Sequence, residues 1–523
     1  MPKRTKPSRD MDAALQVERA RPIVFQDRAE LLHMVGMVIG VIVLPLAGGI
    51  GHALAYGLLA LWALRSPRHA LEALTLTWLL NFLNPGIYSP SGQSDMLRWA
   101  VVGSAFLSVI RVGMLSDQRF GGRPLTTPAW YAVALFCSVA AILALFASYI
   151  PDVSMSMLAM FLIGTTTVLF GYALTASAVD YWERWFLVFF GVILLVGFPL
   201  IVHDLGYARN NRGFQGLTNH PQTYGVFLAP FLSWIVALLL SRRLTGTLWW
   251  GIVGVACISL IATQARTGAF AVALGLTLMI GFKYFQRPAV RAMLSAWLPR
   301  LILAGLLGMA GLVAYGVDVR THVVEFVQKQ ELDPERGRID MDEVTRTRRM
   351  LTDQSLANFE ESPLVGIGFG VRSSPSYALV RARMENAGLG ERAEDLFPEA
   401  YDYPRDPIFG IPMAGGSEKG TTVVAVLEEV GVIGFAFFLL MLGALLLPTL
   451  RASVGIAPGA LMLTGFLLTF GEAVFFAFGG MGLLLWLLFG LGYTQARERA
   501  PHATATQRAH RERREPVNGN ETA

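Results

Sequence analysis

Charged residues are scarce in this chain of 523 residues. Asp, Glu, Lys and Arg make up 15% of it, whereas about 25% is usual for a soluble domain. Hydrophobic residues reach 54%, and the mean hydropathy is +0.49. These values exclude an ordinary soluble protein and predict a polytopic membrane protein. The net charge of +5 does not indicate nucleic-acid binding, because the Lys and Arg residues of membrane proteins concentrate in their cytoplasmic loops.

Cysteine is nearly absent as well. The chain has only Cys137 and Cys257, and both lie inside apolar segments. Two such residues provide neither a disulfide framework nor the spacing of a metal site. We therefore predict that both are packing residues, and we assign no metal site to the chain.

Apolar segments, in contrast, recur along most of the chain. A membrane-spanning helix needs roughly 20 mostly apolar residues, and about 14 segments qualify. They lie near residues 31–48, 49–64, 70–86, 96–115, 128–150, 155–178, 185–203, 220–240, 247–263, 268–284, 298–316, 421–448, 457–476 and 478–495. The expected fold is an all-α polytopic membrane protein.

The basic residues predict the orientation of these spans. Every second loop carries Lys or Arg, and the loops between them before residue 317 are nearly free of both. By the positive-inside rule, both termini then lie in the cytoplasm. The expected regions are a cytoplasmic tail (1–30), a bundle of about 11 helices (31–316), an extracytoplasmic loop (317–420), further transmembrane helices (421–495) and a cytoplasmic, disordered tail (496–523).

The first tail is too long and too polar for the n-region of a signal peptide. The extracytoplasmic loop is too long for a simple connector. Its stretch 341–361 has apolar residues at helical spacing, including Leu356 and Phe359, so we expect it to be partly helical.

Four arginines lie on the predicted outer side, against the positive-inside rule: Arg98, Arg209, Arg212 and Arg266. A guanidinium group suits a phosphate, which it can bind through two parallel hydrogen bonds. The start of a helix adds backbone N–H donors to such a site. One alternative is contact with lipid headgroups through snorkelling side chains. Because Arg212 and Arg266 accompany a long outer loop, we favour a pocket for a polyanionic headgroup.

Two other residues have alternative interpretations. His220 in "TNHPQ" is either a ligand-binding or proton-handling residue, or a helix cap before a proline in the first helical position; the cap is favoured. Glu472 lies late in an apolar segment. A carboxylate inside a membrane suggests a function, and pairing with an arginine is the alternative.

Four stretches resemble a known family. They are "RGFQGLTNHPQTYGVFLA" (212–229), "QARTGAF" (264–270), "RRMLTDQSLANFEESPLVGIGFG" (348–370) and "VLEEVGVIGFAFF" (426–438). In order and predicted sidedness they are similar to motifs of the O-antigen ligase and Wzy-type polymerase superfamily, which assembles bacterial envelope polysaccharides. The third contains Pro-Leu-x-Gly-x-Gly and the fourth Glu-x-Gly-x-x-Gly. The resemblance covers residues 200–445.

The chain departs from the family pattern at one place. Many members have a His-Asn pair at the start of the helix that follows the loop, where this chain has Gly420 and Thr421. The histidine is implicated in catalysis by the ligases, so its absence favours a polymerase over a ligase. Glu418 is our candidate for the missing base and Lys419 for a phosphate contact. A glycine-rich lead into a helix, with Glu418 near its positive end, is the structural alternative.

The resemblance implies a metal-independent glycosyltransferase without a cofactor, in the bacterial cytoplasmic membrane. Its donor would be a polyprenyl-diphosphate-linked oligosaccharide and its acceptor a glycan. A chain-length regulator and a flippase are candidate partner proteins. The residues implied in diphosphate binding are Arg209, Arg212, Arg266, Arg348, Arg349, Lys419 and His220, with Arg212, Arg266 and Glu418 proposed as catalytic.

Two other classes of membrane protein are alternatives. A transporter or flippase of lipid-linked sugars would have the same multi-span architecture, although we see no internal repeat of the kind that transporters often have. A polyprenyl-phosphate-sugar transferase usually carries acidic residues in its first outer loop. The corresponding stretch here, residues 45–54, has none, which argues against that class.

Overall fold

The computed structural model describes residues 22–25, 27–88, 94–115, 127–148, 151–207, 213–286, 295, 352–353, 355–370, 421–451, 454–471 and 474–512. Within these ranges the chain is helical, with 13 long α-helices, a short helical stretch at residues 355–361, several short 3-10 helices and an isolated bridge between Leu83 and Thr218. The all-helical class expected from the sequence is therefore confirmed for the described residues.

The helices follow the apolar segments of the sequence. Up to residue 286 they are α2 (Arg28–Val43), α3 (Gly48–Ala63), α4 (Pro67–Asn81), α5 (Ser94–Leu115), α6 (Pro128–Ala147), α7 (Pro151–Leu174), α8 (Val179–Gly197), α9 (Pro221–Leu240), α10 (Thr247–Ala262) and α11 (Arg266–Gln286). The last three are α17 (Thr422–Leu450), α18 (Ile456–Leu468) and α19 (Met481–Glu512). The segment expected at 298–316 lies outside the described residues.

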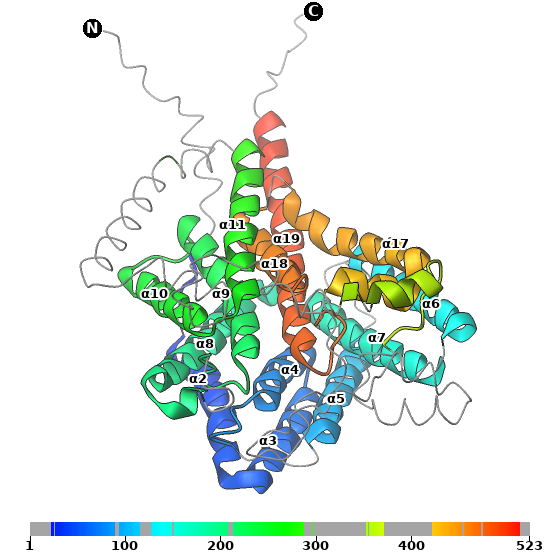
Figure 1. The fold of residues 1–523 in the computed structure, drawn as a ribbon. Helices are drawn as coiled ribbons and strands as arrows, with labels where there is room; N and C mark the ends of the chain where they lie inside the picture. The colour runs from blue at the N-terminus through cyan, green and yellow to red at the C-terminus, as the bar shows by residue number, and fades with distance from the viewer. Residues whose placement is uncertain are drawn as a thin grey trace, which may run out of the picture.

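Among the described residues, eight stretches are long and apolar enough to cross a membrane, which indicates a multi-pass membrane protein. One of them, Arg28–Ala63, has 36 residues. As a single helix it would be about 54 Å long, nearly twice the roughly 30 Å of a bilayer core. The 3-10 helix η1 (Leu44–Ala47), with Pro45 and the left-handed Gly48 (φ +74°), divides it into α2 and α3, which meet at a turn at the lower edge of Figure 1.

The core of the bundle is α9, which is buried along almost its whole length. Aromatic side chains fix its position: Phe227 stacks on Trp78 of α4, with ring centroids 5.5 Å apart, and Phe231 stacks on Phe190 of α8 at 4.7 Å. Large rings bury much apolar area with few rotatable bonds. These two contacts, one helical turn apart, hold the middle of α9 against α4 and α8.

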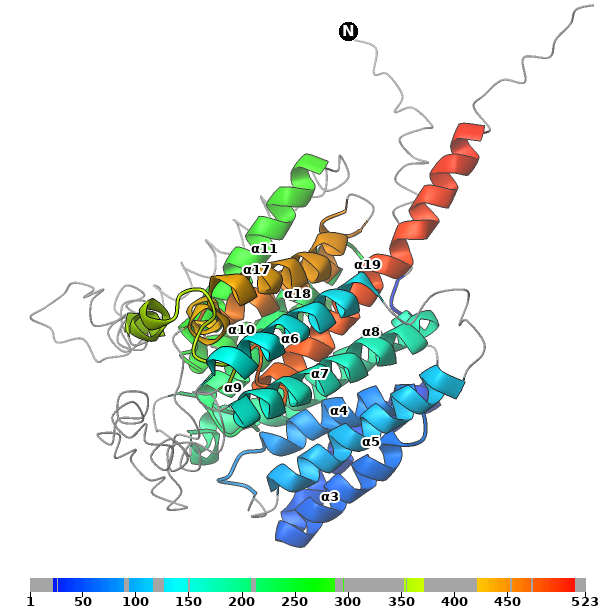
Figure 2. The ribbon, with the colours of Figure 1, turned by 90° about the vertical axis from the view of Figure 1, so that its right-hand side faces the viewer.

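The helix ends gather at two ends of the bundle. In Figure 2 most helices run along one diagonal, from lower left to upper right. We call the upper-right end, where α8 begins and α9 and α11 end, the ion-pair end, because Glu183, Arg243 and Lys283 belong to these parts of the chain. We call the opposite end the loop end; it contains residues 82–88, 203–207 and 213–220 and the starts of α9, α11 and α17.

Candidate functional site

Buried amides hold the segments of the loop end together. Asn84 is fully buried, and its Nδ2 donates to Leu205 O (2.7 Å) and Gly216 O (2.9 Å). Its Oδ1 accepts from Gln215 Nε2 (3.0 Å) and Gly86 N (2.9 Å). One side chain thus joins the turns after α4 and α8 to the segment that leads into α9.

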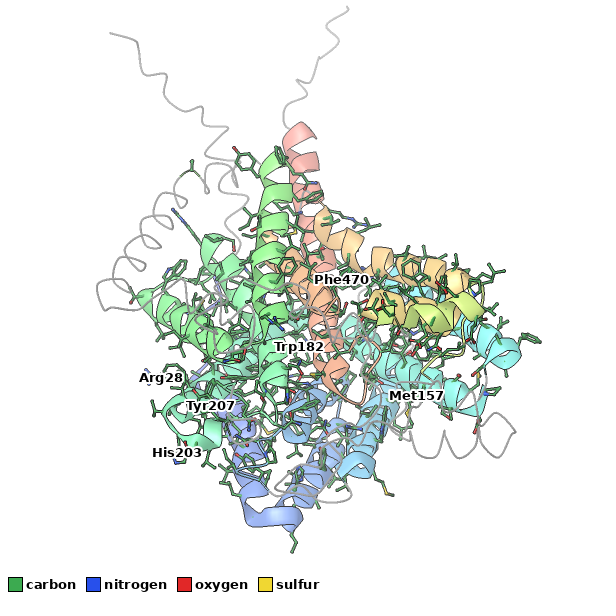
Figure 3. All side chains as sticks on the ribbon, viewed as in Figure 1. Arg28, Met157, Trp182, His203, Tyr207 and Phe470 are labelled. Carbon is green, nitrogen blue, oxygen red and sulfur yellow. The ribbon has the colours of Figure 1, made fainter. Side chains whose placement is uncertain are left out.

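The rest of this segment is equally well anchored. Phe214 N donates to Ala262 O at the end of α10 (2.9 Å), and Asn219 N donates to Phe82 O (2.8 Å). Burial raises the pKa of Tyr88 to about 12, so its phenol stays neutral. Figure 3 labels His203 and Tyr207 in the turn that Asn84 holds. These bonds anchor residues 213–220 at the entrance to α9, and we call this segment the platform.

His220 is the N-cap of α9. Its Nδ1 accepts a hydrogen bond from Gln222 N (3.1 Å), and Pro221 occupies the first helical position. This is the cap that the sequence favoured. Because Nδ1 accepts, the proton of the neutral ring lies on Nε2. The side chain is half-buried.

Arg266 begins α11, directly beside the start of α9. Ala265 packs against Gly225, and a Cβ on Gly268 would lie 3.3 Å from Gly225 O. Gln264 takes a left-handed conformation (φ 55°), which turns the chain sharply after α10, and Arg266 N donates to Gln264 O (3.0 Å). Close packing thus brings a half-buried arginine and the positive end of a helix to the loop end.

The start of α17 joins the same region. Thr422 N donates to Thr469 O at the end of α18 (3.0 Å), and Gly471 packs against Thr267 of α11. Thr421 caps α17, since its Oγ1 accepts from Val424 N (3.3 Å). The starts of α9, α11 and α17, which are far apart in the sequence, therefore lie near one another.

A second outward arginine is found at the loop end. Arg98, at the start of α5, donates through Nη1 to Asn81 Oδ1 (3.1 Å). A Cβ on Gly479 would lie 3.2 Å from its Nη2. Both outward arginines that the structure describes, Arg98 and Arg266, are thus at this end.

The two glycine motifs contact each other through their backbones. Ile367 N donates to Glu428 O (2.9 Å) and Gly368 N to Glu429 O (3.0 Å). Val432 N donates to Pro363 O (2.9 Å) and Ile433 N to Leu364 O (3.2 Å). The pairing is possible because α17 is broken at Gly431 (φ 61°, ψ −170°), which frees backbone groups for bonding.

Glycines are required at this crossing. A Cβ on Gly431 would collide with the backbone of Leu364, and one on Gly366 (φ +73°) with the backbone of Glu429. Past the crossing, Phe369 enters an aromatic cluster with Phe136, Phe161 and Phe476, and Gly370 packs against Met157, which Figure 3 labels at the start of α7. Residues 363–370 are therefore part of the bundle rather than a surface connection.

Sequence reasoning missed one polar pair at this crossing. Asn358 Nδ2 donates to Glu428 Oε1 (2.6 Å), and the side chains are 5% and 0% exposed. Asn358 belongs to the helical residues 355–361, where part of the helix expected at 341–361 is observed. An acidic residue within an apolar stretch is the signal that the sequence offers for Glu428, whereas the Glu-x-Gly-x-x-Gly motif begins at the next residue, Glu429.

The other proposed residues lie outside the described part of the chain. They are Arg209, Arg212, Arg348, Arg349, Glu418, Lys419 and Glu472. Their convergence on one site stays a prediction.

The ion-pair end binds its charges differently. Arg243 makes two hydrogen bonds of 2.6 Å to Glu183, whose Oε1 also accepts from Gln495 Nε2 (2.7 Å). Glu72 accepts from Trp62 Nε1 (2.9 Å), Arg68 Nε (3.1 Å) and the Tyr181 hydroxyl. Most partners of these carboxylates come from other parts of the bundle, so we interpret the carboxylates as structural groups.

Compared with known proteins, the chain matches no family model and no curated sequence at a significant level.

Proposed function

We propose that the chain is a membrane glycosyltransferase of the O-antigen polymerase and ligase type. It would join a polyprenyl-diphosphate-linked oligosaccharide to a glycan acceptor, with chain growth favoured over ligation. The observation that carries the proposal is the backbone pairing of residues 363–368 with 428–433. These are the two glycine-rich stretches of the resemblance, and a shared origin with that superfamily explains why both are present and bonded to each other.

The proposed topology has about 14 membrane helices and cytoplasmic termini, with the loop end outside. The distribution of basic residues supports it. The ion-pair end carries Arg65, Arg68, Arg111, Arg184, Arg242, Arg243, Lys283 and Arg451. The described residues of the loop end include only Arg98 and Arg266 among the arginines and lysines of the helix ends. Residues 317–420 would then be extracytoplasmic.

In the proposed reaction, an acceptor hydroxyl oxygen attacks the anomeric carbon of the donor sugar. The bond from this carbon to the diphosphate oxygen breaks, and polyprenyl diphosphate leaves with the bonding electron pair. Arg266 and the start of α11 would stabilise the charge that develops on the diphosphate. Arg212 and Arg348 are proposed to act with it, and Glu418, just before α17, is proposed to take the hydroxyl proton.

Purified protein in liposomes, supplied with a lipid-linked oligosaccharide, tests the proposal. Longer glycans indicate a polymerase, transfer to a different acceptor indicates a ligase, and movement without a new bond indicates transport. We expect Arg266→Ala to abolish the product and Arg266→Lys to retain part of it, because a lysine keeps the charge but not the planar fork.

Arg451→Ala is the matched control. This exposed arginine lies at the ion-pair end and should be dispensable for the reaction. A normal product from Arg266→Ala would remove Arg266 from the mechanism. The absence of any new glycosidic bond with the wild-type protein would overturn the proposed function.

The transporter alternative gains one observation, the break in α17, because transporters often bind substrates or ions at broken helices. Here, however, Glu428 O and Glu429 O accept bonds from residues 367 and 368, and Val432 N and Ile433 N donate to residues 363 and 364. The protein itself thus uses the backbone groups that a transported substrate would need. We therefore rank transport second.

A further inference from the structure

Residues 355–361 form a short helix that rests on α17 through an unusual face. Figure 1 shows it beside α17 at the right of the molecule. Ser355 and Asn358 are buried, at 1% and 5% exposure, whereas Leu356 is 38% exposed. Residues three apart share one face of a helix. The face turned inward is therefore polar, and apolar burial alone does not explain why the helix docks there.

The polar face of the short helix contacts a carboxylate of α17, a helix long enough to span a membrane. Glu428 is fully buried, and its Oε1 lies 2.6 Å from Asn358 Nδ2. A buried carboxylate is costly unless hydrogen bonds compensate it, and bonds to a carboxylate are stronger than bonds between neutral groups. Docking of the short helix therefore relieves part of the cost of burying Glu428.

The pair also lies next to the break in α17. Glu428 accepts a bond from Asn358 through its side chain and from Ile367 N (2.9 Å) through its backbone oxygen. The same residue thus contacts both the short helix and the stretch 363–368. The short helix and the glycine-rich stretch are joined by a turn in which Gly366 N donates to Ser362 O (2.8 Å).

We propose that Asn358 and Glu428 are a positioning pair, which fixes the middle of the 317–420 loop in the break of α17. Without the bond, residues 355–370 would leave the break more often, and the freed backbone groups of α17 would be exposed to lipid. The docking follows from the contacts above, whereas its consequence for glycan synthesis rests on the proposed function.

A pair of introduced cysteines reports the docking. Ile433 N lies 3.2 Å from Leu364 O, and both side chains are exposed, at 42% and 63%. Leu364→Cys/Ile433→Cys would be made in full-length protein with Cys137→Ala and Cys257→Ala, which removes the two native cysteines. The yield of disulfide on mild oxidation in membranes then measures how often the segment occupies the break.

Isosteric substitutions test the hydrogen bond between Asn358 and Glu428 without changing the shapes of the two side chains. Asn358→Asp places two carboxylates together and should lower the disulfide yield about tenfold. Glu428→Gln keeps an acceptor but weakens the bond, so it should lower the yield less. The double variant Asn358→Asp/Glu428→Gln restores one donor and one carboxylate with their positions exchanged, and should return the yield to near that of the wild type. Glu360→Gln, at an exposed position of the same helix, is the matched control and should change nothing.

Two results would overturn the proposal: an unchanged yield in Asn358→Asp, or a double variant that is no better than the worse single variant. Should Asn358→Asp fail to accumulate, the milder Glu428→Gln and the double variant still decide the question. The disulfide yield of the double variant exceeds that of Glu428→Gln only if the two side chains interact.

Glycan synthesis gives the readout that separates positioning from catalysis. In Glu428→Ala, activity should fall and should return when the 364–433 disulfide forms, then fall again on reduction. Activity that stays lost despite the disulfide would assign Glu428 a role other than positioning and overturn the proposal. If the wild-type protein makes no glycan, the proposed function fails, and the disulfide yields still test the pair.

Discussion

Both ends of the helical bundle contain buried polar side chains, but the ends use them in different ways. At the ion-pair end, Glu183 meets Arg243 and Gln495, and each of these groups comes from a different part of the bundle. At the loop end, Asn84 and the N-caps of α9 and α17 mainly bond backbone groups of turns and helix starts, and Gln215 bonds the side chain of Asn84. The hydrogen bonds at the ion-pair end neutralise buried charges, whereas those at the loop end fix the conformation of the backbone in turns and helix starts.

This difference fits the proposed function. Carboxylates that already hold an arginine have little capacity for a charged ligand, so the ion-pair end is suited to holding helices together. The loop end carries Arg98, Arg266 and several helix starts, whose backbone N–H groups suit an anion of the kind that the proposed function requires. Substitutions at the ion-pair end should therefore lower the stability of the protein. Substitutions at the loop end should mainly affect glycan synthesis or the order of the platform.

The largest effect is expected from Glu183→Ala. It would leave the Arg243 guanidinium buried without its carboxylate, which should lower the free energy of unfolding by about 3–5 kcal/mol. Thermal unfolding of the purified protein measures this loss. In the double variant Glu183→Gln/Arg243→Met, no buried charge is left alone, so most of the stability should return.

Glu30→Ala provides the comparison for that experiment. The Arg184–Glu30 pair is about one-fifth exposed on each side, and its loss should cost less than about 1 kcal/mol. Equal losses from Glu183→Ala and Glu30→Ala would contradict the structural importance of the buried pair.

The break in α17 should be the next most sensitive position. Gly431→Ala forces an alanine into a backbone conformation that is nearly restricted to glycine, at about 1–3 kcal/mol, and adds a collision with Leu364. We expect a loss near the upper limit, together with a low yield of the 364–433 disulfide. Gly443→Ala is the control in the same helix, because a Cβ there meets only Leu447 Cδ1, at 3.9 Å. Similar melting temperatures for the two variants would show that the break is not constrained.

Asn84→Ala tests the platform. It leaves Gly216 O and Gln215 Nε2 without their partner and should cost about 1–3 kcal/mol. Hydrogen exchange of residues 213–220 should become faster, since they lose their main anchor. Gln222→Ala, a half-buried amide at the same helix entrance, should leave the exchange of residues 213–217 unchanged. Unchanged exchange in Asn84→Ala would mean that other contacts hold the platform.

A smaller effect on stability than at Asn84 is expected at His220. As a helix cap it should tolerate Asn, which caps well, and His220→Ala should cost about 1 kcal/mol. Stability and glycan synthesis are measured together. A His220→Asn protein that is stable but inactive would show that the imidazole takes part in the chemistry and would contradict a role limited to capping.

Some of these features were accessible from the sequence because they are local. The length of an apolar run predicts a helix that can cross a membrane, and the runs at 128–150 and 220–240 are indeed α6 and α9. The His-Pro pair at 220 marks a helix start by the same logic, since a cap and a first-turn proline act within a few residues. The arginine at 266 was likewise expected at a helix start, and α11 begins there.

The partners of buried charges depended on the folded chain. Glu183 and Gln495 are separated by 312 positions, and Asn358 and Glu428 by 70. Helical periodicity shows which residues share a face but not which helix that face meets. The pairing of residues 363–368 with 428–433 also needed the break at Gly431, since a continuous helix would have kept these backbone groups for itself. Burial of a charge is favourable only when its partner arrives from elsewhere in the chain, so this information resides in the packing of the helices.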